Sequence, residues 1–186
     1  MQFTNQTNKN KQQSISPGLY LVSTPIGNME DITFRALNVL KKSDIILCED
    51  TRRSGKLLSY FKIESKLLSY HKFNEEKVSK NIIDTIKKNK VISLISDAGT
   101  PTVSDPGVIL VNKCIKENLS VYPIPGSSAV TSAVSISGFS DQYLFYGFLP
   151  KKEKELEKIL KNFCNLDYSI VFFIPASKID FYISEF

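Results

Sequence analysis

Short apolar runs alternate along the chain with segments in which apolar residues recur every three or four positions. The short runs are rich in Val, Ile, Leu and Tyr, so they predict buried strands. These strands cover residues 19–22, 45–48, 67–70, 91–95 and 119–124. The helical spacing predicts helices at residues 32–40, 57–61, 74–86 and 108–117. Strands and helices that alternate in this way predict a mainly parallel sheet with helices on both faces.

The pattern changes after Pro125. A segment of small residues, 126–138, precedes an aromatic strand, and the remaining elements are a charged helix and a second strand. We expect them at residues 142–148, 151–163 and 170–174. The predicted fold is therefore α/β, with an N-terminal domain at residues 17–124 and a smaller α+β domain at residues 125–186. Because two strands and a helix offer little core, we expect this second domain to be incomplete. Residues 1–16 are polar and predict a disordered extension.

Two features at the starts of the predicted helices indicate caps. Asp31 stands before the helix at residues 32–40, and Asn74 stands before the helix that contains Glu75 and Glu76. Both side chains are of a type that accepts hydrogen bonds from the first backbone N–H groups of a helix. We therefore predict that Asp31 and Asn74 are N-cap residues.

Composition excludes some classes of protein. The 186 residues are 42% hydrophobic and 23% charged, which is typical of a globular chain. The net charge of +5 is a mild excess that suits an anionic partner. A single histidine and three scattered cysteines without a CxxC pair argue against a metal site, and we expect the cysteines to be buried. No secretion signal or membrane-spanning run is present, so a cytoplasmic protein without a membrane partner is expected.

Loops dense in Gly, Pro, Ser, Thr and Asp follow three of the predicted strands. They cover residues 23–28, 96–107 and 125–129. In a parallel α/β sheet, ligands bind beyond the carboxyl ends of the strands. Neither a GxG dinucleotide fingerprint nor a phosphate-binding GxxxxGK[ST] loop occurs in the sequence. The three loops therefore favour a site for an uncharged or zwitterionic nucleoside over a polyphosphate.

Several uncommon motifs stand in order along the chain. They read LVSTPIGN at 21–28, DIT at 31–33, EDTR at 49–52, SDAGTP at 96–101, DPG at 105–107 and GFLP at 147–150. In these motifs, over about residues 18–150, the chain resembles the ribosomal RNA small-subunit methyltransferase I family, which is tetrapyrrole-methylase-like. The resemblance implies a two-domain, tetrapyrrole methylase-like fold and a homodimer. It also implies S-adenosylmethionine-dependent 2′-O-methylation of a cytidine ribose in 16S ribosomal RNA of the small subunit.

The resemblance also assigns a cofactor site to the three loops. The residues it implies are Pro25, Ile26 and Gly27, then Gly99, Thr100, Pro101 and Val103, then Ser127, Ser128 and Ala129.

A ribose hydroxyl is a poor nucleophile, so a general base would help the reaction. Asp50, His71 and Glu49 are the candidates, with Glu75 behind them, because they stand at or just after predicted strand ends. An ion pair that shapes the loop is the competing role for the two acids, and a structural hydrogen bond is the competing role for His71.

Three cations follow the EDTR motif closely. Arg52, Arg53 and Lys56 would contact RNA phosphates, as Arg and Lys commonly do, or form a solvated surface.

The chain departs from the family near its end. The family has a Glu and a His-Arg pair where this chain has Ile174, Ser177 and Lys178, and it has Pro-Gly-Pro where this chain has Ser127 as the third residue. Two alternatives stay open: a methylase of a small tetrapyrrole-like substrate, and a non-catalytic protein that binds RNA or the ribosome.

Overall fold

The computed structural model describes residues 15–185, and its central feature is a five-stranded parallel sheet with the order β3-β2-β4-β1-β5. The strands are β1 (Gly18–Val22), β2 (Ile45–Cys48), β3 (Lys66–Ser69), β4 (Val91–Leu94) and β5 (Val121–Ile124). The predicted strands and their parallel arrangement are confirmed. Of the predicted disordered extension, residues 1–14 lie outside the described residues. Ile15 packs against the core, and the Ser16 carbonyl accepts a hydrogen bond from the Tyr20 hydroxyl.

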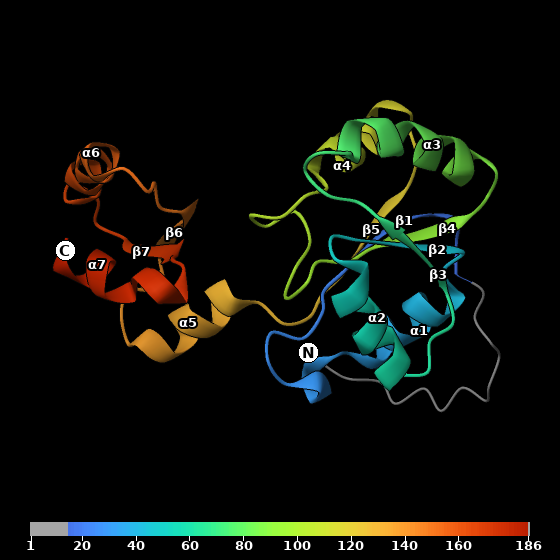
Figure 1. Cartoon of the computed structure of the whole chain (residues 1–186), viewed down its shortest axis with the longest axis horizontal. Helices are drawn as coiled ribbons and strands as arrows, with labels where there is room; N and C mark the ends of the chain where they lie inside the picture. Colours follow the sequence, from blue (N-terminus) through green and yellow to red (C-terminus); the bar gives the residue numbers. More distant parts are fainter. Residues whose placement is uncertain (1–14, 186) are drawn as a thin grey trace, which may run out of the picture.

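Helices cover both faces of this sheet (Figure 1). They are α1 (Phe34–Lys42), α2 (Thr51–Tyr60), α3 (Glu75–Lys87) and α4 (Val108–Lys116), and a 3-10 turn, η1 (Met29–Asp31), precedes α1. Successive strand residues point to opposite faces, so each strand contributes apolar side chains to two cores. Tyr20 and Val22 of β1 join the core beneath α1 and α2, whereas Leu19 joins the core beneath α3 and α4. The continuous apolar runs in the sequence follow from this burial on both faces.

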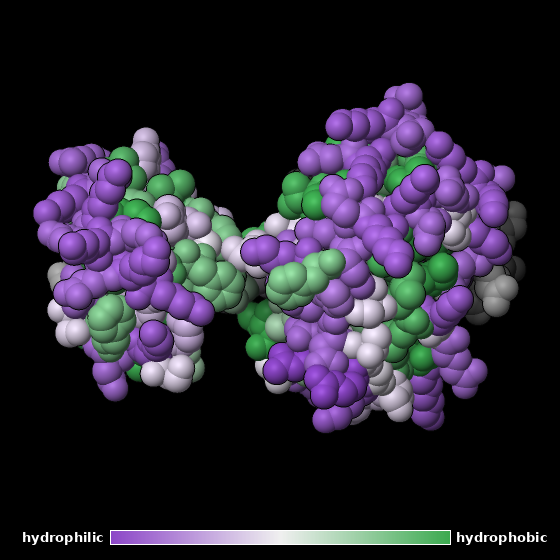
Figure 2. Space-filling view, turned by 45° about the horizontal axis from the view of Figure 1, so that its top comes forward, coloured by the Kyte–Doolittle hydropathy of each residue, from purple (hydrophilic) through white to green (hydrophobic). Residues whose placement is uncertain are grey.

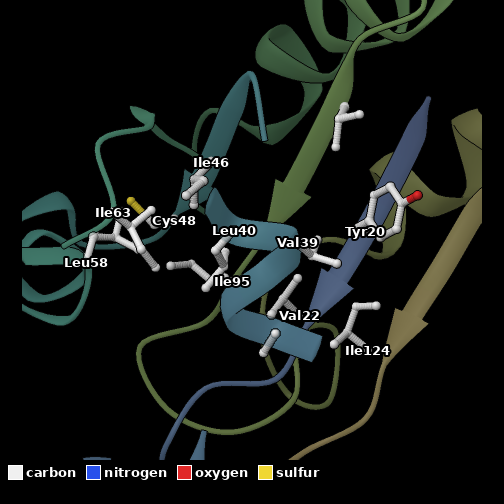
Figure 3. Close-up of a cluster of buried hydrophobic side chains, with 12 residues drawn as sticks. Tyr20, Val22, Val39, Leu40, Ile46, Cys48, Leu58, Ile63, Ile95 and Ile124 are labelled. Carbon is white, nitrogen blue, oxygen red and sulfur yellow. The ribbon is translucent and has the colours of Figure 1, made fainter. Parts of the chain in front are cut away.

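The core on the α1 side is close-packed. Val39 and Leu40 of α1 lie against Val22, Ile46 and Ile124 of the strands (Figure 3), and all five side chains are at most 2% exposed. Burying a side chain of this size contributes about 1.5–3 kcal/mol to stability. Hydrophobic burial therefore fixes the sheet in place and holds the loops beyond its strands at one edge.

Two of the sequence predictions about helix starts need correction. The residue that caps α1 is Thr33, whose Oγ1 accepts a hydrogen bond from Ala36 N at 3.0 Å, because Asp31 lies in the 3-10 turn before it. Asn74 stands at the N-cap position of α3, but its side chain makes no capping hydrogen bond and instead bonds the backbone of His71 and Ser69. Local polar residues thus predicted where helices start but not which side chain caps them.

The remaining residues form a smaller lobe (Figures 1 and 2). We call residues 15–124 the N-terminal lobe and residues 125–185 the C-terminal lobe; a narrow waist joins them. The elements of the second lobe are α5 (Ala129–Ser137), β6 (Tyr143–Phe148), α6 (Glu153–Phe163), β7 (Ser169–Phe173), η2 (Ala176–Lys178) and α7 (Ile179–Ser184). Strands β6 and β7 pair in parallel, and Leu149, Leu156 and Tyr182 form a small buried core.

Helix α5 is an element that the sequence pattern did not predict. Its residues are mostly Ala, Val, Ser and Thr, only Val130 is buried, and so it lacks the apolar stripe that identifies a helix in a sequence. Helix α2 is also longer than predicted, since it begins at Thr51 and not near Leu57. The first turn of α2 was missed because it is polar: Asp50 caps it, and Arg52 and Arg53 face solvent, so it lacks the apolar spacing of a helix.

Three further features bear on membranes, metals and thiols. Within residues 15–185, no helix is long and apolar enough to cross a membrane. The same residues contain no cluster of three or more His, Cys, Asp or Glu side chains placed to hold a metal ion. Cys48 and Cys114 are buried as expected, but Cys164 is exposed, so the prediction of burial was wrong there.

Candidate active site

The loops after β4, β1 and β5 come together because these three strands are neighbours in the sheet. Thr24 and Gly99 exchange two backbone hydrogen bonds, Thr24 N to Gly99 O at 2.9 Å and Gly99 N to Thr24 O at 3.0 Å. The Thr24 hydroxyl also donates to Ser96 O at 3.1 Å. The first and second loops are therefore locked together by their backbones, as a site built from the ends of several strands requires.

Hydroxyl groups join the third loop to this pair. Ser23 Oγ and Thr100 Oγ1 lie 3.0 Å apart, and Thr100 Oγ1 donates to Ser127 O at 3.4 Å. Gly126 passes so close to the first loop that a Cβ added to it would lie 2.9 Å from Ser23 Cβ. Any larger residue at position 126 would push the loops apart.

The loop after β4 holds strained backbone. Gly99 has a φ of +83°, and the non-glycine residues Thr102 and Ser104 have φ values of 72° and 63°. A β-branched residue with positive φ is rare, and such conformations persist only where the surrounding structure imposes them, often at functional sites. The strain therefore marks residues 99–104 as a candidate site independently of composition.

A pocket of about 330 Å³ opens beside these loops, between the two lobes; we call it the interlobe pocket. Its lining comprises Ile26, Asp97, Ala98, Gly99, Thr100, Val103, Ser104, Asp105, Ser128, Ala129, Val130, Phe148 and Phe173. Six of the predicted cofactor residues are in this lining: Ile26, Gly99, Thr100, Val103, Ser128 and Ala129. Among the described residues of the lining, the charged side chains are Asp97 and Asp105, and aromatic rings come from the second lobe.

The other four predicted cofactor residues lie around the pocket. Pro25 and Gly27 line a smaller cavity of about 150 Å³, together with Arg53 and Asp97. Pro101 is buried, and Ser127 supports Thr100 through its carbonyl oxygen and donates its hydroxyl to Asp31 O at 3.2 Å.

A third pocket, of about 380 Å³, shares lining residues of the same loop with the interlobe pocket; we call it the side pocket. Its lining comprises Glu49, Lys72, Glu75, Ser104, Asp105, Pro106, Gly107 and Val108. Of the four candidate bases, the structure thus places Glu49 and Glu75 in the side pocket. The side pocket is more polar than the interlobe pocket because two carboxylates besides Asp105, and one ammonium group, surround it.

Asp50 is engaged in a local ion pair. Its two carboxylate oxygens accept from Arg52 Nε at 3.1 Å and Arg52 Nη2 at 2.8 Å, and Oδ1 also accepts from Arg52 N at 2.8 Å. The hydrogen bonds from the guanidinium and the backbone hold the pKa of Asp50 well below its usual value. Such a carboxylate is a weak proton acceptor, so the geometry favours a capping role.

His71 belongs to a turn. Its Nδ1 accepts a hydrogen bond from Phe73 N at 3.3 Å, and its backbone N donates to Asn74 Oδ1 at 2.9 Å. As far as the described residues show, neither the interlobe pocket nor the side pocket includes His71 in its lining.

The three predicted RNA-binding cations lie on the first turns of α2. Arg52 and Arg53 are 86% and 73% exposed and pair with Asp50 and Asp97 respectively, and Lys56 is exposed. An RNA phosphate would therefore have to compete with the carboxylate partner of each arginine. Because both ion pairs are exposed to solvent, they are weak and can be displaced.

Asp105 is a candidate that the sequence prediction missed. It lines both the interlobe pocket and the side pocket. Burial, and then the negative charges of Glu49 and Asp97, raise the pKa of its carboxyl group from 3.8 to about 6, although a hydrogen bond with Ser96 acts in the opposite direction. The DPG motif at residues 105–107 marked Asp105 as part of a family motif. The motif alone does not show which other carboxylates lie around Asp105 in the fold.

Comparisons with known proteins agree with this architecture. Residues 18–181 match the family described as Tetrapyrrole (Corrin/Porphyrin) Methylases. Solved structures with a similar fold include uroporphyrin III C-methyltransferase from Thermus thermophilus, with a TM-score of 0.61, 16% identity and coverage of 90% of this chain and 74% of that chain. Diphthine synthase gives a TM-score of 0.62 at 15% identity, covering 85% of this chain and 64% of the other.

Several curated relatives named ribosomal RNA small subunit methyltransferase I share much more sequence with this chain. The relative from Halalkalibacterium halodurans is 44% identical over 90% of this chain and 58% of its own length. The relative from Rickettsia prowazekii is 48% identical over 89% of this chain and 59% of its own length. The chain thus spans less than two thirds of these two relatives, whereas it covers 70% of the relative from Thermotoga maritima at 46% identity. The chain therefore belongs to the tetrapyrrole methylase family, together with the ribosomal RNA small subunit methyltransferase I proteins.

Proposed function

We propose that this protein transfers a methyl group from S-adenosylmethionine to the 2′-hydroxyl of a cytidine in 16S ribosomal RNA of the small subunit. The observation that carries the proposal is the interlobe pocket, which three locked loops build within the residues that match the family. The proposal includes a homodimer that works in the cytoplasm.

The lining of the interlobe pocket fits this cofactor. Its volume of about 330 Å³ is in the range of small-molecule sites. The charged groups of the described lining are the carboxylates of Asp97 and Asp105, which suit a cationic ligand and would repel a polyphosphate. Phe148 and Phe173 offer apolar ring surface to a nucleobase, and Thr100 offers a hydroxyl beside the glycine at position 99.

Catalysis would depend mainly on positioning. When bound, S-adenosylmethionine supplies a methyl group that is already activated on a sulfonium. The loops would hold the cofactor in a fixed position, because hydrogen bonds make them rigid. Thr24 and Gly99 are joined by two backbone hydrogen bonds, and the Thr100 hydroxyl is hydrogen-bonded to that of Ser23. Holding two reactants in line removes much of the entropic barrier of a bimolecular reaction. The RNA would approach over α2, where Arg52, Arg53 and Lys56 are exposed.

Transfer of labelled methyl from S-adenosylmethionine to small subunits that lack the modification tests the proposal. Thr100→Arg should abolish both cofactor binding and transfer, because an arginine side chain would occupy the interlobe pocket. Thr85→Arg is the matched control. Thr85 lies near the C-terminal end of α3, close to where β4 begins, and the interlobe pocket lies beyond the opposite, carboxyl ends of the strands. Label on a base or a tetrapyrrole, or no cofactor binding by the unaltered protein, would refute the proposal.

A further inference from the structure

Two residues, Ser104 and Asp105, line both the interlobe pocket and the side pocket. If one pocket holds the methyl donor, an acceptor in the neighbouring pocket meets it at these two residues. Ser104 has a positive φ of 63°, and its Oγ lies 3.0 Å from where a Cβ added at Gly147 of β6 would stand. The junction between the pockets is therefore held by the strained loop on one side and by the second lobe on the other.

The carboxylate at this junction differs from the other acids around it. Glu75 Oε2 accepts hydrogen bonds from Gly107 N at 3.3 Å and from the Tyr70 hydroxyl at 3.4 Å. Asp97 Oδ2 accepts from Arg53 at 3.2 Å. Glu49 lines the side pocket and is exposed. Asp105 alone among these described acids lines both pockets without an arginine partner in the structure.

The surroundings of Asp105 make it a better proton acceptor than an ordinary carboxylate. Partial burial and the negative charges of Glu49 and Asp97 raise the pKa of its carboxyl group to about 6. Three of the charged groups around it come from other elements: Glu49 after β2, Lys72 before α3 and Glu75 in α3. Asp97 lies in the same loop as Asp105 and pairs with Arg53 of α2. A general base works best when its pKa lies near the working pH while the base is still mostly ionised.

We propose that Asp105 is the general base for methyl transfer, and that the side pocket receives the acceptor nucleotide; the inference rests on the proposed function. The acceptor oxygen forms a bond to the methyl carbon while the carbon–sulfur bond breaks and leaves its electron pair on sulfur. The hydroxyl proton moves to the carboxylate of Asp105 and from there to water. Lys72, which lines the side pocket, provides a cation for the nucleotide phosphate.

The test compares Asp105→Asn with Asp141→Asn, a control in which an exposed aspartate before β6 loses its charge in the same way. Asp105→Asn should still bind S-adenosylmethionine, with an affinity lowered by at most about tenfold, because Asp97 keeps its negative charge in the interlobe pocket. Its single-turnover methyl transfer should fall by about 100-fold or more. The rate of the unaltered protein should rise with pH up to about 6 and then level, and this inflection should be missing from Asp105→Asn. Asp141→Asn should match the unaltered protein in every measurement.

A second measurement needs no turnover. Carboxyl carbon NMR of the cofactor-free protein should show one aspartate that titrates near pH 6, and that signal should be absent from Asp105→Asn. Glu49→Gln should move the titration to lower pH, because it removes a negative charge beside Asp105.

The outcomes separate the two proposals. Transfer by Asp105→Asn at the unaltered rate, or titration of Asp105 below pH 5, would overturn the base assignment and leave the proposed function standing. Cofactor binding without transfer by the unaltered protein would overturn both.

Discussion

Replacing Asp105 with asparagine should raise the free energy of unfolding above pH 6 and change it little near pH 4. In the folded protein, the pKa of this carboxyl group is raised from 3.8 to about 6 by burial and by the nearby carboxylates of Glu49 and Asp97. The folded state therefore holds the proton more tightly than the unfolded state does. The unaltered protein loses stability as the pH rises from about 4 through 6, and above that range the loss is constant. Asparagine carries no charge at any pH in this range, so the variant avoids the loss.

The size of the effect follows from the pKa. A tenfold change in proton affinity corresponds to 1.36 kcal/mol, so the rise at Asp105 corresponds to about 3 kcal/mol if the group were fully shielded from water. Asp105 lines two open pockets and is only partly buried, so solvent screening reduces the figure to about 1–2 kcal/mol. Asparagine also keeps an oxygen that can accept the hydrogen bond of Ser96.

Urea unfolding followed by circular dichroism between pH 4 and pH 8 measures this difference. The stability gain of Asp105→Asn over the unaltered protein should grow from near zero to its full value across that range. Asp141→Asn should show a flat difference, because Asp141 is exposed. Equal or lower stability of Asp105→Asn at pH 8 would refute the claim that burial, together with the charges of Glu49 and Asp97, disfavours the ionised form of Asp105.

Two further predictions concern packing. Leu110→Ala should lower the free energy of unfolding, measured by the same urea assay, by about 2–5 kcal/mol, because Leu110 is 0% exposed on the buried face of α4. Ile115 of the same helix is 61% exposed, so Ile115→Ala should cost less than about 1 kcal/mol. Gly126→Ala should weaken cofactor binding by about tenfold in calorimetry, because its new Cβ would lie 2.9 Å from Ser23 Cβ. Gly55→Ala is the control and should bind the cofactor normally, since the nearest atom to its new Cβ would be 4.0 Å away. Tight binding by Gly126→Ala would contradict the close approach of these loops.

The sequence predicted the N-terminal lobe well because its elements carry strong local patterns. The β1 residues Leu19 to Val22 are apolar on both faces, and the parallel sheet followed from their alternation with helices. The pattern failed at α5, where a mixture of mostly small residues, Ala, Val, Ser and Thr, forms a helix with one buried side chain. There the fold depends on what the helix contacts and not on its own periodicity. The same limit explains Asp31 and Thr33, since either residue type caps a helix and only the path of the backbone decides which one does.

The sequence by itself determined which loops could form a site. Glycine, proline and hydroxyl residues after β1, β4 and β5 marked them, and six of the ten predicted cofactor residues line one pocket. Which acid faces that pocket was decided only by the tertiary structure. Asp50 is held by Arg52 two residues away. The pKa of Asp105 is raised by burial, then by Glu49, which follows β2, and by Asp97, which lies eight residues earlier in the same loop. Residue types and local spacing fix backbone pattern and burial, but the pKa of a carboxylate depends on burial and on charges brought near it through space by the fold.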